Sequence, residues 1–100
     1  MNQTFVIQSP DSSSKGLAPI GSRKEIVDQL SSLNTAPERD GEDTLFGPGI
    51  RIDLTPGRDP VEQMLLSVTE EEIAYLVIMR ISRICGWRII DPETGQELDP

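Results

Sequence analysis

The stretch that most constrains the fold runs from Thr69 to Asp91, because it joins a helix start, an apolar stripe, a helix stop and a strand. Glu72 follows Thr69 by three residues, the spacing of a capping box, which satisfies free amide groups at a helix start. Gly86 is the residue type that most often ends a helix in a left-handed conformation. These signals predict a helix from Glu70 to Cys85 with Thr69 as its N-cap.

The predicted helix carries most of its apolar side chains on one broad face at helical spacing. The residues expected to face the core are Ile73, Ala74, Val77, Ile78, Ile81, Ile84 and Cys85. Glu72, Tyr75, Ser82 and Arg83 are expected to lie away from it. Leu76 and Met79 flank the exposed side beside Arg80 and Arg83, so either a neighbouring loop covers them or they contact a partner.

Four segments have the composition of strands: Thr4–Gln8, Ile50–Leu54, Glu62–Val68 and Trp87–Ile90. Ile50–Leu54 alternates apolar and polar residues, as a half-buried strand does. Ser22 and Glu25 repeat the capping-box spacing ahead of apolar residues at helical spacing. This pattern predicts a short first helix from Arg23 to Leu33.

The element order is therefore β-α-β-β-α-β in a single α+β domain of 100 residues. That order predicts the ferredoxin-like plan, a four-stranded antiparallel sheet with two helices on one face. Residues 9–21 and 35–48 are predicted to be flexible loops, with the acidic segment 35–44 the most mobile. Residues 96–100 are predicted to return as a short strand or to fray.

Alternation along the strands divides the sheet into a helix-covered face and an open face. The residues assigned to the helix-covered face are Phe5, Ile7, Ile52, Leu54, Met64, Leu66, Val68, Trp87 and Ile89. The usual strand order of this plan would bring together Ile90, Val6 and Leu65 as an aliphatic strip on the open face, with Arg88, Arg51 and Asp53 at its rim. A contiguous apolar patch rimmed by charge is typical of an interface. The competing prediction is that the tail folds over this strip and partly covers it with Leu98.

Composition excludes several classes of function. A net charge of −8 disfavours nucleic-acid binding, which usually requires a basic patch. The chain has one cysteine and no histidine, so we expect no disulfide, no zinc or copper site, no cofactor and no catalytic nucleophile with its base. Because no catalytic candidate is visible, we expect that the protein is not an enzyme. No secretory leader or membrane-spanning run is visible, which predicts a soluble cytoplasmic protein.

Two functions remain open. The first is a non-catalytic protein-protein interaction module that binds a protein partner or a second copy of itself. It would use the open sheet face, the Leu76 and Met79 side of the helix, or both. The alternative is a regulatory domain that binds a small anionic ligand at the start of the first helix. Its candidate residues are Lys15, Gly16, Ser22, Arg23 and Lys24, although the spacing of a P-loop is absent.

Overall fold

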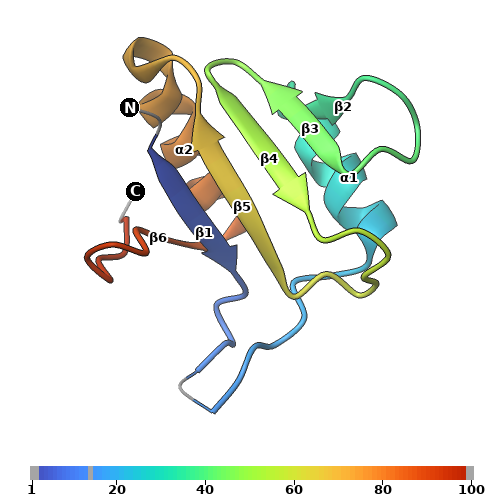
Figure 1. Ribbon diagram of the computed structural model, residues 1–100, viewed down its shortest axis with the longest axis vertical. Coiled ribbons are helices and arrows are strands. Elements are labelled where there is room, and N and C mark those ends of the chain that lie inside the picture. Colours follow the sequence, from blue (N-terminus) through green and yellow to red (C-terminus); the bar gives the residue numbers. More distant parts are fainter. Residues whose placement is uncertain (1–2, 14, 99–100) are drawn as a thin grey trace.

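The computed structural model describes residues 3–13 and 15–98, which form a six-stranded antiparallel sheet with two helices on one face (Figure 1). The strands are β1 (Thr4–Gln8), β2 (Ala36–Pro37), β3 (Thr44–Gly47), β4 (Ile50–Leu54), β5 (Gln63–Val68) and β6 (Arg88–Ile90). The helices are α1 (Arg23–Ser31) and α2 (Glu71–Cys85). The strand order in the sheet is β2-β3-β4-β5-β1-β6.

The α+β class and the antiparallel sheet are confirmed, but the prediction of four strands was wrong. The four expected strands are neighbours in the expected order, β6-β1-β5-β4, and two more strands extend the sheet beyond β4. Both extra strands, β2 and β3, lie within the segment 35–48 that was predicted to be a loop. β3 forms a hairpin with β4 that sets Leu45 opposite Ile52, and both side chains are fully buried.

Alternation correctly predicted the face of the sheet that the helices cover. The residues assigned to that face are all buried: Phe5, Ile7, Ile52, Leu54, Met64, Leu66, Val68, Trp87 and Ile89. They join Ile26 and Leu30 of α1 and Ala74, Ile78 and Ile81 of α2 in one apolar cluster. Burial of this cluster is the main force that stabilises the sheet against the helices.

The start of α2 differs from the prediction. Glu70, not Thr69, is the N-cap, and its side chain forms no capping hydrogen bond. The carbonyl of Gly49, in the β3–β4 turn, instead accepts hydrogen bonds from the amides of Thr69 and Glu70, at 2.8 and 3.1 Å. A tertiary contact therefore takes the place of the predicted capping box. The predicted stop is confirmed, because Gly86 is left-handed with φ 72°.

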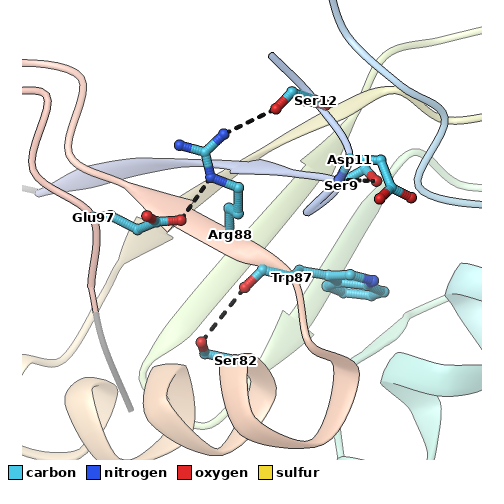
Figure 2. Close-up of polar contacts among 7 residues, drawn as sticks. All are labelled: Ser9, Asp11, Ser12, Ser82, Trp87, Arg88 and Glu97. Carbon is cyan, nitrogen blue, oxygen red and sulfur yellow. Dashed lines mark hydrogen bonds and ion pairs between the residues drawn. The ribbon is translucent and has the colours of Figure 1, made fainter.

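The buried stripe of α2 is rotated relative to the prediction. Ser82, expected outside, is buried, whereas Ile73 and Ile84, expected in the core, are 39% and 54% exposed. The hydroxyl of Ser82 lies 3.5 Å from the carbonyl oxygen of Trp87, which gives the buried oxygen atom a polar neighbour (Figure 2). Serine is small and can be buried when its hydroxyl has such a neighbour. A prediction based on polarity alone therefore placed Ser82 wrongly at the surface.

The first helix begins as predicted and ends earlier. The capping box between Ser22 and Glu25 is complete, with both reciprocal hydrogen bonds present. The helix ends at Ser31, and Asn34 then adopts a left-handed conformation with φ 59° that turns the chain into β2.

Candidate functional site

The predicted aliphatic strip lies on the open face of the sheet. Val6 of β1 is directly opposite Leu65 of β5 on one side and Ile90 of β6 on the other. Leu65 is 44% exposed, and Val6 and Ile90 are half-buried. Both helices lie behind the sheet in the view of Figure 1, so this face is not covered by α1 or α2.

Two of the predicted rim residues border the strip and pair with each other. Asp53 lies opposite Leu65, and its carboxylate accepts hydrogen bonds from the Arg51 Nε atom at 3.1 Å and from the Thr44 hydroxyl at 2.8 Å. Phe46 lies opposite Arg51 and is 45% exposed. Sequence reasoning missed Phe46 because it fell within the predicted loop, where the adjacent apolar residues Leu45 and Phe46 are too few to show a period.

A depression of about 250 Å³ lies beside the strip, where β4 and β5 are joined. Its lining residues are Asp53, Leu54, Thr55, Pro56, Gln63, Met64 and Leu65. This volume is below the roughly 300–1,000 Å³ of typical small-molecule pockets. The depression is therefore smaller than a typical metabolite site.

The third predicted rim residue, Arg88, holds two segments onto β6. Its Nε atom donates to the Glu97 carboxylate at 2.7 Å, and a terminal nitrogen donates to the Ser12 carbonyl at 3.2 Å (Figure 2). The Leu98 amide donates to the Ile89 carbonyl at 2.8 Å, so the tail pairs with the outer edge of β6. The described part of the tail therefore runs along the sheet edge, while residues 99–100 lie outside the described range.

The exposed side of α2 is a second apolar surface. Leu76 is 78% exposed, Ile73 is 39% exposed and Met79 is half-buried. Glu72 and Arg80 are exposed one helical turn before and after Leu76. We call these five residues, Glu72, Ile73, Leu76, Met79 and Arg80, the α2 flank. Leu76, at its centre, lies on the side of α2 away from the sheet, whereas the Ile73 side chain also lies against Gly49 of the β3–β4 turn. The α2 flank is therefore on the helix-covered side of the molecule and the aliphatic strip is on the open face.

The residues predicted to bind an anion lie at the start of α1 and in the loop before it, and those on the helix are paired within the chain. The Arg23 amide donates to the Asp59 carboxylate at 3.1 Å, and its guanidinium forms an ion pair with Asp43. Lys24 forms an ion pair with Asp28 at 2.8 Å, which raises the pKa of the lysine.

The Ser22 hydroxyl accepts from the Glu25 amide at 3.1 Å and is the main cause of the lowered pKa of the Glu25 carboxyl. Lys15 and Gly16 lie in a turn closed by two hydrogen bonds between Ser13 and Gly16, and Ser14 lies outside the described residues. Carboxylates of the chain itself thus occupy the cationic groups of Arg23 and Lys24 that an anionic ligand would need, whereas no carboxylate partner of Lys15 is found among the described residues.

The structure shows how the single thiol is placed. Cys85 is half-buried, and desolvation raises the pKa of its thiol from 9.0 to about 11. The thiol is therefore protonated at neutral pH and is a poor nucleophile.

Two further findings apply to the described residues alone. No group of three or more potential metal ligands occurs within 3–13 and 15–98. No helix in this part of the chain has the length and apolar character needed to span a membrane.

Comparisons of the chain with protein-family models, with curated proteins and with solved structures found no match. The candidate site therefore rests on the geometry of this chain.

Proposed function

We propose that this chain is a non-catalytic protein-protein interaction module that uses the open sheet face and the α2 flank. The observation that carries the proposal is the register that aligns Ile90, Val6 and Leu65 across three adjacent strands, with Leu65 still 44% exposed. An apolar strip on an uncovered sheet face, beside a hollow and a charged pair, has the anatomy of an interface.

The free energy available from covering the exposed apolar side chains supports a partner of modest affinity at this face. Complete burial of a leucine side chain is worth about 1.5–3 kcal/mol. Leu65 retains 44% of its exposure, so covering it would yield about 1 kcal/mol. Val6, Ile90 and Phe46 add similar or smaller gains, offset by the cost of association. The Arg51–Asp53 pair is already satisfied within the chain, so it contributes orientation more than affinity.

Two further inferences accompany this proposal. We infer that α1, α2 and the four strands β6-β1-β5-β4 follow the ferredoxin-like plan, with β2 and β3 as an extension of the sheet; the neighbour order supports this reading. We also infer a cytoplasmic protein; a chain that has one cysteine and no disulfide is compatible with a reducing compartment.

The test compares Leu65→Glu with Leu17→Glu. Leu17 is 42% exposed in the loop after β1, so it matches Leu65 in type and exposure but lies outside the sheet. Both variants should melt close to the wild-type chain, because neither side chain is in the core. Pull-downs from native cell extract should lose bound protein with Leu65→Glu and keep it with Leu17→Glu. Equal capture by both variants would contradict the use of the sheet face.

A further inference from the structure

The α2 flank carries charges that the chain itself does not neutralise. Among the described residues, Glu72 and Arg80 take part in no ion pair, whereas Arg51 and Arg88 beside the aliphatic strip are both paired. Glu72 and Arg80 are eight residues apart, about 12 Å along a helix, so they are too distant to pair with each other. The flank therefore presents an unpaired negative charge at one end and an unpaired positive charge at the other.

The residues of the flank are also spaced symmetrically about Leu76, with opposite charges at equal distances and apolar side chains at equal distances. Glu72 and Arg80 stand four residues before and after it, and Ile73 and Met79 stand three residues before and after it. Positions at these spacings share one side of a helix. A two-fold axis that passes between two antiparallel α2 helices at the level of Leu76 would bring each Glu72 to the same height as the Arg80 of a second copy, across the contact. The same axis would bring each Ile73 to the same height as the other copy's Met79.

We propose that the α2 flank is a two-fold interface between two copies of this chain, with their α2 helices packed antiparallel and Leu76 at the centre. This inference rests on the proposed function, because it names the partner for one of its two surfaces. The charge pattern favours a second copy over an unrelated protein, since an isologous contact satisfies both charges of both copies at once.

The arrangement has further physical support. Leu76 is 78% exposed, the largest value among the exposed large apolar side chains of the described residues. An antiparallel pair of helices also aligns the positive end of each helix dipole with the negative end of the other. The open sheet face lies on the opposite side of the molecule and stays free in such a dimer. A substitution that disrupts one of the two surfaces should therefore leave the other intact.

Charge exchange tests the geometry directly. Sedimentation equilibrium from low micromolar to near-millimolar concentration should show the wild-type chain as a dimer in equilibrium with monomer. Glu72→Arg alone sets two arginines against each other at both symmetric contacts, and Arg80→Glu sets two glutamates. Each variant should weaken dimerisation by more than about tenfold. Glu38→Arg and Arg39→Glu, which make the same changes on exposed residues of the β2–β3 loop, should leave dimerisation unchanged.

The decisive sample is an equimolar mixture of the Glu72→Arg and Arg80→Glu chains. Each is repelled by its own copy, but together they restore both opposite-charge contacts, so the mixture should form a heterodimer. A mixture that stays monomeric while wild type dimerises would overturn the antiparallel axis through Leu76. A wild type that is monomeric throughout would also overturn the proposal, while the Leu65 pull-down would still test the proposed function. Dimerisation lost with Leu65→Glu but kept in both charge variants would overturn it in favour of the sheet face.

Discussion

The β3–β4 turn is predicted to hold the start of α2 in place, and Gly49→Ala tests this. A β-carbon at Gly49 would lie 2.6 Å from the Ile73 Cγ1 atom and 2.9 Å from the carbonyl oxygen of Glu70. Gly49 also has φ +72°, a conformation that residues with a β-carbon rarely adopt. The substitution therefore adds backbone strain and a steric conflict with the first turn of the helix.

Gly86 separates the two contributions. It has the same φ, +72°, but nothing lies within 4 Å of the position of its β-carbon. Gly86→Ala should cost only the left-handed strain, about 1–2 kcal/mol. Gly49→Ala should cost that amount and also displace the Glu70 carbonyl, which accepts hydrogen bonds from the Ile73 and Ala74 amides. With net contributions of about 0.5–1.5 kcal/mol per hydrogen bond, the additional loss should be about 1–3 kcal/mol.

Urea unfolding at constant temperature measures both variants on one scale. Additional destabilisation of about 2 kcal/mol corresponds to a melting temperature lower by about 8–16 °C in a domain of this size. The two variants should have m-values near that of wild type, because the native surface changes little. Equal losses of stability for Gly49→Ala and Gly86→Ala would refute the packing of the turn against α2.

Three other predictions concern the core, the thiol and the acidic loop. Leu54→Asp or Ile81→Asp should abolish the cooperative melt, because each would bury an unpaired carboxylate among apolar side chains; a melt within a few degrees of wild type would contradict the assigned faces. With a folded-state pKa of about 11 against an ordinary 9.0, Cys85 should hold about 100-fold less thiolate than a free cysteine at pH 8, so alkylation in the native protein should be correspondingly slow. The same shift means that the thiol stabilises the fold below pH 9 and that this contribution declines as pH rises towards 11. A glutamate-specific protease should make its first internal cut after Glu38 or Glu42, which are exposed between β2 and β3; protection of both bonds would contradict a mobile loop.

The strands that sequence reasoning found and those it missed differ in length and in the number of alternating buried residues. Ile50–Leu54 offers three alternating buried residues, and the buried positions follow that alternation. β3 has four residues and one buried side chain, Leu45, while β2 has two residues, one of them proline. Neither is long enough to show a period. They exist because β4 offers an edge for pairing, and this is a tertiary cause that no local pattern reveals.

The open-face strip could be predicted because its members come from three strands with adequate alternation. Knowing the faces and the strand order was enough to place Val6 between Leu65 and Ile90. The hydrogen-bond partners of the rim residues could not be predicted in the same way. Arg88 is engaged by Glu97 and by the Ser12 carbonyl, and these contacts depend on where a loop and a tail happen to run.

The missed rotation of α2 and the apolar character of its exposed side have the same origin. Ala74 and Ser82 are small residues on the buried stripe, and small side chains let a helix approach the sheet closely. With Ser82 inside, the stripe turns away from Ile73 and Ile84, which then lie at the surface. Hydrophobicity alone assigns both isoleucines to the core, because it does not weigh the size of the residues that compete for contact with the sheet. The apolar area left outside on α2 is therefore a consequence of how the core packs, and Ile73 becomes available to a second molecule for that reason.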